Sequence, residues 1–282
     1  MLQTGLPRPI VDRLVSRALE EDLGLAGDIT TAATVISTSP ITTSIAARAA
    51  GTISGHQLAS TAFHALDPNV SLSHLSHDGA RVEAGTKLIE MTGAPQAILT
   101  AERVALNFMI HMSGIATLTA RYVDAIEGTN AAICCTRKTL PGLRAIEKYA
   151  VKSGGGMNHR FGLDDAVLIK DNHIAAAGGI KQAITAARAH AGHMTRIEVE
   201  VDTLDQLAEA LNHKVDVIML DNMNNDDLRK AVALVDGRAV TEASGGVNLD
   251  TVRNIAETGV DMISVGALTH SAPALDLGLD FH

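Results

Sequence analysis

The sequence predicts an α/β protein with two domains, the second of them a barrel of parallel strands covered by helices. The chain has 282 residues, and because domains average roughly 150 residues, this length favours two domains. Hydrophobic residues make up 46% of the chain and charged residues 20%, an ordinary balance for a globular protein with a sizeable core. From residue 131 onward, short apolar runs alternate with helical patterns, which is the order of a parallel sheet packed against helices.

The N-terminal part of the chain reads as mixed α and β. Its repeating patterns predict helices over 8–23 and 56–66, and strands within 44–53 and 69–91. A long helix is predicted from residue 101 onward with Thr100 as its N-cap, because a threonine hydroxyl can accept from the first free N–H groups. Ser113-Gly114 is predicted to kink this helix near its middle.

The remainder of the chain predicts a repeated strand–helix unit. The expected strands are 131–136, 166–170, 197–201, 215–220, 239–243 and 260–265. The expected helices between them are 141–152, 179–191, 203–212, 225–235 and 248–258. Because no glycine-rich dinucleotide fingerprint follows the first strand, six such strands favour a barrel over an open Rossmann sheet.

Charged or glycine-rich residues follow nearly every predicted strand. They are Thr136-Arg137-Lys138, Lys170, Glu198 and Glu200, Asp221, Ser244-Gly245-Gly246 and Gly266-Ala267. In α/β barrels the reactive groups gather at the C-terminal ends of the strands. Each segment alone would more often be a solvated loop or an ordinary turn, but their agreement on one rim favours a functional site.

The chemistry of this rim points to anionic ligands. Its cations are Arg137, Lys138, Arg160 and Lys170, and arginine can bind a carboxylate or phosphate through two parallel hydrogen bonds. Glu200 and Asp221 suit Mg²⁺, which prefers a few carboxylates together with water and substrate phosphates. The turns Ser244–Gly246 and Val265–Ala267 would offer backbone N–H groups to a phosphate. We therefore expect an anionic phosphosugar, Mg²⁺ and a second anion.

Composition excludes several other classes of protein. A net charge of −9 and only 2% aromatic residues argue against a nucleic-acid partner. No run approaches the roughly 18–20 apolar residues of a membrane helix, and the N-terminus lacks a signal-peptide pattern, so we expect a cytoplasmic protein. Cys134 and Cys135 are adjacent and form neither a disulfide framework nor a thiolate zinc motif, so we expect them in a buried strand.

The histidines carry less information. For His159 and His173, a hydrogen bond to a ligand and a structural role are both open, because neither shows metal-ligand spacing with a second histidine. Surface or turn positions are expected for His56, His64, His74, His77, His190, His193 and His213.

The segment 136–173, TRKTLPGLRAIEKYAVKSGGGMNHRFGLDDAVLIKDNH, closely resembles the quinolinate phosphoribosyltransferase family. The resemblance continues through EEDLGLAGDITT at 20–31, TAERVALN at 100–107, SGIAT at 113–117, IEVEV at 197–201, IMLDN at 218–222, EASGG at 242–246 and ISVGALTHS at 263–271. It implies an N-terminal α/β domain, residues 1–112, on which the tail 270–282 packs back. Residues 113–269 would form an incomplete six-stranded barrel like that of type II phosphoribosyltransferases.

The resemblance also implies a reaction and its residues. Quinolinate and 5-phosphoribosyl 1-diphosphate would give nicotinate mononucleotide, CO₂ and diphosphate for NAD biosynthesis. Quinolinate would be held by Arg137, His159, Arg160, Lys170 and Arg103 from the neighbouring subunit of a homodimer. Phosphoribosyl diphosphate and its Mg²⁺ would contact Lys138, Glu200 and Asp221, which are the expected catalytic residues. Thr136 is expected to bind substrate as well. Its 5′-phosphate would lie on Ser244, Gly245, Gly246, Val265, Gly266 and Ala267. The division of Lys138 and His159 between the two substrates stays open, as does assembly beyond the dimer.

Three alternatives remain at this stage. Lys170 lies at a strand end where an aldolase would place a Schiff-base lysine. A related protein could use another nitrogen heterocycle or serve molybdenum transport, although the intact basic set favours a dicarboxylate. A phosphosugar-binding protein without turnover is the alternative that is not an enzyme.

Overall fold

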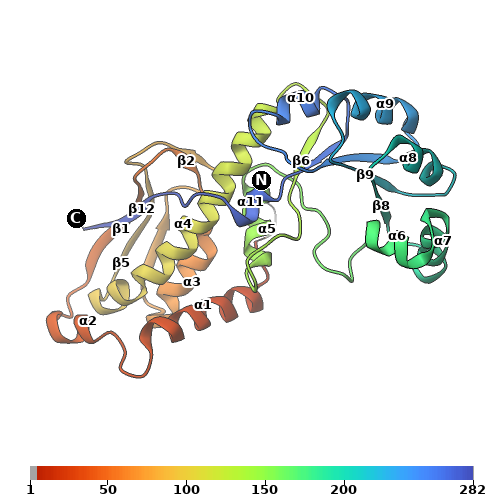
Figure 1. Ribbon diagram of the computed structural model, residues 1–282. Coiled ribbons are helices and arrows are strands. Elements are labelled where there is room, and N and C mark those ends of the chain that lie inside the picture. Colours follow the sequence, from red (N-terminus) through yellow and green to blue (C-terminus); the bar gives the residue numbers. More distant parts are fainter. Residues whose placement is uncertain (1–4, 282) are drawn as a thin grey trace. The chain divides into compact units, whose positions relative to one another are not determined.

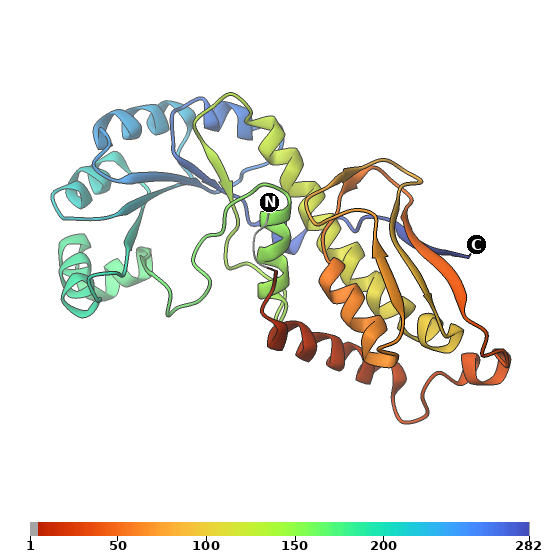
Figure 2. The same ribbon diagram turned by 180° about the vertical axis from the view of Figure 1, so that it is seen from behind.

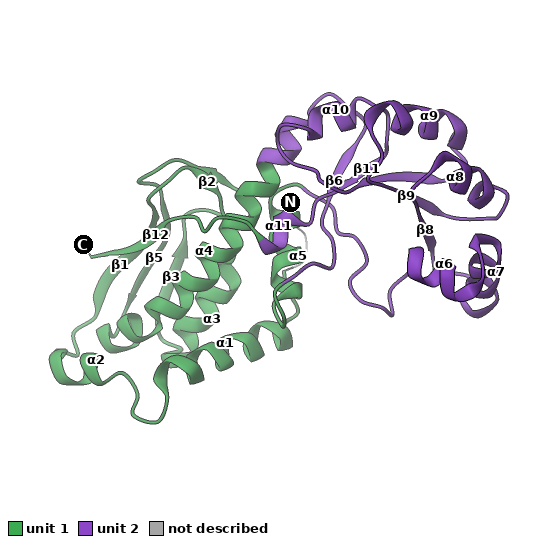
Figure 3. Cartoon of the chain, viewed as in Figure 1, with its two compact units in different colours: residues 1–120, 140–155, 271–282 green, residues 121–139, 156–270 purple. Residues whose placement is uncertain are grey.

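The computed structural model describes residues 5–281, so the outermost ends of the two predicted terminal segments, 1–4 and 282, lie outside the described residues. The described chain forms two units (Figure 3). Unit 1 contains residues 5–120, 140–155 and 271–281, and unit 2 contains residues 121–139 and 156–270. The predicted boundaries were 112/113 and 269/270, whereas the chain passes between the units four times, at 120/121, 139/140, 155/156 and 270/271.

Unit 1 is built on a four-stranded antiparallel sheet with helices on one face (Figures 1 and 2). The strands run in the order β12 (Leu277–Phe281), β1 (Ile41–Ala47), β5 (Lys87–Gly93) and β3 (Ser71–His74). Its helices are α1 (Arg8–Leu23), α2 (Ile29–Thr34), α3 (His56–Leu66), α4 (Pro95–Ala125) and α5 (Arg144–Ser153). The short strands β2 (Gly51–Thr52) and β4 (Arg81–Val82) pair with each other. The predicted helices 8–23 and 56–66 are confirmed.

The long helix begins earlier than predicted. It starts at Pro95, where proline is tolerated because the first turn of a helix needs no N–H donor. Thr100 is therefore not an N-cap, and its hydroxyl donates instead to Asp28 Oδ2 at 3.0 Å. Since α4 continues to Ala125, the predicted boundary at 112/113 falls within a continuous helix.

The C-terminal tail returns to the N-terminal sheet. β12 pairs antiparallel with β1, with Leu279 opposite Ile45, and Arg48 forms a two-point ion pair with Asp280. Before that strand, the tail runs close to α4, because a Cβ on Gly114 would lie 2.2 Å from the carbonyl oxygen of Pro273. Glycine is thus required where the two backbones meet.

Unit 2 is an open parallel sheet of six strands, which confirms the incomplete barrel. The strands are β6 (Ala132–Cys134), β7 (Val167–Ile169), β8 (Ile197–Val201), β9 (Val217–Asp221), β10 (Val240–Ser244) and β11 (Met262–Ser264). Their order is β6-β11-β10-β9-β8-β7, so β6 and β7 are the two edges. The helices are α6 (Asp171–Ala177), α7 (Ile180–His190), α8 (Leu204–Leu211), α9 (Asn225–Val235), α10 (Val252–Ala256) and α11 (Ala267–His270). The predicted helix 141–152 forms as α5 but belongs to unit 1.

The two faces of this sheet differ in chemistry. On one face, side chains at alternate strand positions are completely buried, such as those of Val199, Ile218 and Ile263. This is the apolar face, which the flanking helices cover. The register pairs Glu200 with Met219 and Met219 with Glu242, so these three side chains share the opposite face. The opposite face is therefore where polar groups collect. Among residues 5–281, no helix is long and apolar enough to cross a membrane.

Candidate functional site

The carboxylates predicted at the rim lie on one face of unit 2, at the carboxyl ends of adjacent strands. Glu200 is near the end of β8, and Asp221 and Ser244 end β9 and β10. The register pairs Asp221 with Ser244, and it pairs Glu200 with Met219, two residues before Asp221. Because residues two apart on a strand share a face, all three polar side chains point to the polar face of the sheet. The side chain of Lys170, which follows β7, forms an ion pair with Glu200.

Lys170 and Glu200 connect the edge strand to its neighbour. The Lys170 side chain is 45% exposed and that of Glu200 10%, so the ammonium group stays accessible while its counter-ion is buried. The Lys170 backbone N–H donates to Nδ1 of His173 at 3.0 Å. This contact gives His173 a structural role at the start of α6.

Arg137 and Arg160 are two partly buried guanidinium groups that act on each other. Burial and the charge of Arg137 lower the pKa of Arg160, and Glu198 and Asp165 oppose that change. Nη1 of Arg160 donates to the Ala166 carbonyl at 2.9 Å. In residues 5–281, the buried Nε atoms of both arginines are among the few side-chain atoms without a hydrogen-bond partner. Buried donors normally find acceptors, so this pair is arranged for an anion.

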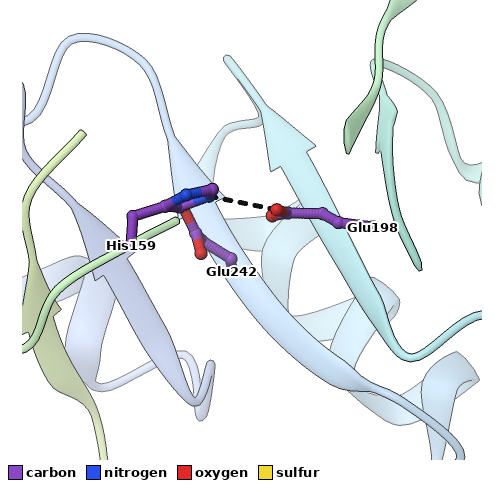
Figure 4. A group of neighbouring side chains, drawn as sticks. All are labelled: His159, Glu198 and Glu242. Atoms are coloured by element: carbon purple, nitrogen blue, oxygen red, sulfur yellow. Dashed lines mark ion pairs between the residues drawn. The ribbon is translucent and has the colours of Figure 1, made fainter. Parts of the chain in front are cut away.

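His159 lies against two buried carboxylates, Glu198 and Glu242 (Figure 4). Its Nε2 is 3.0 Å from Glu198 Oε2 and 3.7 Å from Glu242 Oε1. The Arg160 backbone N–H donates to Nδ1 at 2.7 Å, so Nδ1 carries no proton and the ring proton on Nε2 faces the carboxylates. Burial and the charge of Glu198 raise the pKa of Glu242 to about 7. This cluster supports the backbone that carries Arg160.

The two predicted phosphate turns contribute unequally. Gly245 and Gly246 have φ values of +97° and +62°, a region that strongly favours glycine. In the second turn, the Val265 N–H donates to the Cys134 carbonyl at 2.9 Å, so it is engaged within the sheet. The Val265 N–H is therefore not available to a phosphate, and the phosphate role of Gly266 and Ala267 stays a prediction.

Lys138 follows β6 and contacts α11, the helix that follows β11. Its backbone N–H donates to Thr136 Oγ1 at 3.0 Å, and its carbonyl accepts from Thr269 Oγ1 at 2.7 Å. A Cβ on Gly266 would lie 3.1 Å from Lys138 Cδ and 3.2 Å from His270 Nε2. Thr136 thus shapes the turn that presents Lys138, and Gly266 leaves room for both side chains.

Sequence reasoning missed three residues that the structure brings to this region. Glu242 lies on the polar face of β10, which the strand alternation in VTEAS could have indicated once the register was known. Asn222 follows Asp221 with a φ of +55°, and no sequence pattern marks that conformation. His270 Nε2 and Lys138 Cδ both lie near the position that a Cβ on Gly266 would take, and no local pattern in the sequence marks that proximity.

Arg103 belongs to unit 1, unlike the other predicted site residues. It lies on α4 and is exposed, one helical turn before exposed Asn107. Its accessible position suits a residue that contacts another molecule.

A cavity of about 1640 Å³ in unit 1 is lined by residues of α1, α3, α5 and the segment 74–79. His56 was expected on the surface, but it is buried. Its Nδ1 lies 2.7 Å from Asp78 Oδ1 and its Nε2 lies 3.0 Å from Ser76 Oγ. The Tyr149 hydroxyl donates to Asp78 Oδ2 at 2.8 Å. The order of groups matches a Ser–His–Asp triad. Here, however, Asp78 forms hydrogen bonds to His56 of α3 and Tyr149 of α5 and so connects the two helices.

Replacing His56 with alanine is expected to destabilise the protein by about 1–3 kcal/mol, because it removes a hydrogen-bond partner from a buried carboxylate. Burial acts to raise the pKa of Asp78, but hydrogen bonds and charge from His56 and the Tyr149 hydroxyl lower it below the usual value. Asp78 therefore stabilises the native state above its unfolded pKa, and this contribution is lost as pH falls through the lower, folded pKa.

Urea unfolding at neutral and acidic pH measures this effect. His56→Ala should lower the free energy of unfolding most at neutral pH and reduce its fall in acid. His193→Ala, at an exposed position, is the control and should leave both values near wild type. Equal stability of the His56 and His193 variants would show that the hydrogen bond between His56 and Asp78 does not stabilise the fold.

Comparison with known proteins identifies relatives along nearly the whole chain. The family model described as quinolinate phosphoribosyl transferase, N-terminal domain, matches residues 28–113, and the C-terminal domain model matches residues 115–280. The nicotinate-nucleotide pyrophosphorylase [carboxylating] of Mycobacterium leprae is 47% identical over 271 residues, covering 94% of this chain and 95% of the relative. A probable nicotinate-nucleotide pyrophosphorylase [carboxylating] of Bacillus subtilis is 43% identical, covering 95% of this chain and 92% of that protein.

Solved structures give the same result. NadC from Streptococcus pyogenes superposes with a TM-score of 0.95 at 40% identity, covering 99% of this chain and all (100%) of that chain. The nicotinate-nucleotide pyrophosphorylase from Francisella tularensis gives a TM-score of 0.94 at 40% identity, with 99% and 98% coverage.

Proposed function

The chain belongs to the quinolinate phosphoribosyltransferase family, and from this premise we propose how its residues perform the reaction. The enzyme transfers the phosphoribosyl group of 5-phosphoribosyl 1-diphosphate to quinolinate with decarboxylation, giving nicotinate mononucleotide, CO₂ and diphosphate in NAD biosynthesis. The observation that carries the assignment of residues is the pair of partly buried guanidinium groups with unpartnered Nε atoms.

Quinolinate is a dianion, and the cations of unit 2 form its proposed site. Arg137 and Arg160 repel each other in a partly buried setting, and a bound dicarboxylate would replace that repulsion by charge-assisted hydrogen bonds. Lys170 adds an accessible ammonium group. His159 accepts from the Arg160 backbone N–H, and this contact supports assigning it to the quinolinate side of the site. The Lys170–Glu200 ion pair fits anion binding better than Schiff-base chemistry.

Glu200 and Asp221 fit Mg²⁺ in the chemistry of their donor atoms. Both present carboxylate oxygens at the ends of neighbouring strands, on the same face of the sheet, and Mg²⁺ prefers oxygen ligands with several retained waters. The His159–Glu198–Glu242 cluster suits it less, because it includes an imidazole nitrogen. We propose that Glu200 and Asp221 hold Mg²⁺ directly or through water, together with the diphosphate of the substrate.

The 5′-phosphate would lie on backbone N–H groups of the glycine-rich turns. Ser244, Gly245 and Gly246 follow β10, and Gly266 and Ala267 follow β11 on the neighbouring strand. Both glycines at 245–246 have positive φ, and a glycine turn without side chains lets a phosphate approach the backbone N–H groups. Both turns follow the carboxyl ends of their strands, and Asp221 lies at the carboxyl end of β9.

The proposed mechanism depends on position and charge. Bound Mg²⁺ supplies positive charge that stabilises the leaving diphosphate. Lys138 would add a second cation for that group, and Glu200 and Asp221 would offset the positive charge that develops on the ribose carbon. Arg137, Arg160 and Lys170 orient quinolinate so that its ring nitrogen attacks that carbon. The resulting quaternary nitrogen then stabilises the electron pair left on the ring carbon as the adjacent carboxylate departs as CO₂, and a proton from water completes that carbon.

Arg103 completes the proposed quinolinate site from a second subunit of a homodimer. If so, mixing an Arg103→Ala protein with an Arg160→Ala protein should restore activity, because one site of each heterodimer combines an intact barrel with an intact Arg103. Random exchange of subunits would restore about a quarter of wild-type activity. Activity assays after subunit exchange measure this result, and no recovery would show that Arg103 does not act across the dimer.

A cytoplasmic location, expected from the sequence, remains part of the proposal.

The direct test uses purified protein with carboxyl-labelled quinolinate, phosphoribosyl diphosphate and Mg²⁺. Labelled CO₂ and nicotinate mononucleotide should form in equal amounts and only with Mg²⁺. Nicotinate serves as the parallel substrate, and its use in place of quinolinate would overturn the assigned acceptor. Tight quinolinate binding without product would favour a binding protein that lacks turnover.

A further inference from the structure

Asn222 has a backbone conformation that an asparagine adopts at a cost. Its φ is +55°, in the left-handed region where glycine is unstrained and other residues are uncommon. In the described chain, Asp236 is the one other residue apart from glycine with positive φ. Strain of this kind persists where surrounding contacts hold it, often at functional sites.

The Asn222 side chain makes two contacts that explain its retention. Its Nδ2 donates to Asp221 Oδ2 at 2.6 Å, and this assigns the orientation of the amide, because a carboxylate only accepts. The amide oxygen Oδ1 then faces Gly245, where a Cβ would lie 2.0 Å from it. The Asn222 backbone N–H donates to the Ser244 carbonyl at 2.9 Å.

These contacts connect the two halves of the phosphoribosyl diphosphate site. Asp221 is the proposed carboxylate for Mg²⁺ and diphosphate, and Ser244–Gly246 is the proposed turn for the 5′-phosphate. Asn222 contacts Asp221 and the turn at Gly245. Its hydrogen bond to Asp221 Oδ2 restricts the rotation of the carboxylate and so sets the direction of the other oxygen, Oδ1. Glycine at 245 is required by its φ of +97° and also by the Asn222 amide.

We propose that Asn222 is a positioning residue for phosphoribosyl diphosphate, which sets the orientation of Asp221 relative to the phosphate turn at Gly245. The inference rests on the proposed function of this site. Its physical consequence is unusual for a site residue. Glycine at 222 would relieve the backbone strain while removing the two side-chain contacts, so stability and catalysis should respond in opposite directions.

The test compares Asn222→Gly with a matched control, Asp236→Gly. Asp236 is exposed, has a φ of +49° and ends α9, at the edge of the unit opposite the strand ends that carry the site. Both substitutions remove left-handed strain, and only the first touches the site. A second variant, Asn222→Asp, keeps a residue that tolerates this conformation but replaces the donor by an oxygen.

Three measurements are made on each protein: the melting temperature, kcat and KM for each substrate, and calorimetric binding of phosphoribosyl diphosphate with Mg²⁺. Both glycine variants should melt at or above the wild-type temperature. Asn222→Gly and Asn222→Asp should lose about tenfold to a hundredfold in kcat/KM for phosphoribosyl diphosphate, the range for a lost hydrogen bond to a charged group. The KM for quinolinate should stay within about twofold of wild type, and Asp236→Gly should keep wild-type kinetics.

Two results would overturn the inference. Wild-type kinetics and binding in Asn222→Gly would make Asn222 an ordinary turn residue. A melting temperature well below wild type in that variant would show that its contacts serve the fold. If the wild-type protein fails to turn over quinolinate, the proposed function fails, and calorimetric binding of phosphoribosyl diphosphate with Mg²⁺ still decides whether Asn222 positions that ligand.

Discussion

Arg160→Ala is expected to weaken quinolinate binding by roughly two orders of magnitude, because a charge-assisted hydrogen bond contributes about 1.5–3 kcal/mol and a guanidinium group can make two. The substitution removes one member of the arginine pair that has unpartnered Nε atoms. It should also leave the native fold intact, since the Arg160 side chain makes its hydrogen bond to the Ala166 carbonyl in a loop. Calorimetric titration with quinolinate measures the loss directly.

The control for this experiment is Arg229→Ala. Arg229 pairs with Asp226 on the exposed surface of α9, where an ion pair contributes little to stability. This variant has the same change in net charge, so it accounts for the general effect of removing one cation. An unchanged dissociation constant in Arg160→Ala would remove Arg160 from the quinolinate site.

Asp221→Asn is expected to lower kcat/KM for phosphoribosyl diphosphate by about 10²-fold, comparable with removal of a preorganised electrostatic group. The replacement keeps the shape of the side chain and an oxygen that can accept from Asn222 Nδ2, so the strand end should stay folded. It removes the charge that the proposed Mg²⁺ ligand supplies. Titrating activity against Mg²⁺ should show half-maximal activity at a higher concentration of the metal.

Asp226→Asn provides the matched change in charge. Asp226 is exposed at the start of α9 and takes no part in the proposed site. Its variant should keep the wild-type requirement for Mg²⁺. If Asp221→Asn behaves in the same way as this control, the metal-binding role of Asp221 is wrong.

Much of the barrel follows from short-range patterns in the sequence. Strands buried on one face by helices read as apolar runs, so all six were recognised. The alternation in IEVEV also indicated that Glu198 and Glu200 share a face. The long helix was predicted to start too late because Thr100 was taken as its N-cap, whereas the helix begins at Pro95.

Other parts of the fold depend on contacts between distant residues. The helix 141–152 was predicted correctly, but its place in unit 1 is set by contacts such as Tyr149 with Asp78 and Glu147 with His111. The partners in these pairs are 71 and 36 residues apart, and no local pattern encodes which of them meet. For the same reason the burial of His56 was missed.

The sequence by itself determined the fold class, the family and the chemical character of the rim, because strand periodicity and the residue types at strand ends are local properties. The tertiary structure decided how those residues act. Strand register places Glu242 beside Glu198 and His159, the hydrogen bond from Arg160 orients the imidazole ring, and the left-handed turn at Asn222 brings its amide between Asp221 and Gly245. The positions of Glu242 and of the Asn222 amide depend on two or more strands at once, and which carboxylates the His159 ring meets depends on them too, so only the folded chain fixes these contacts.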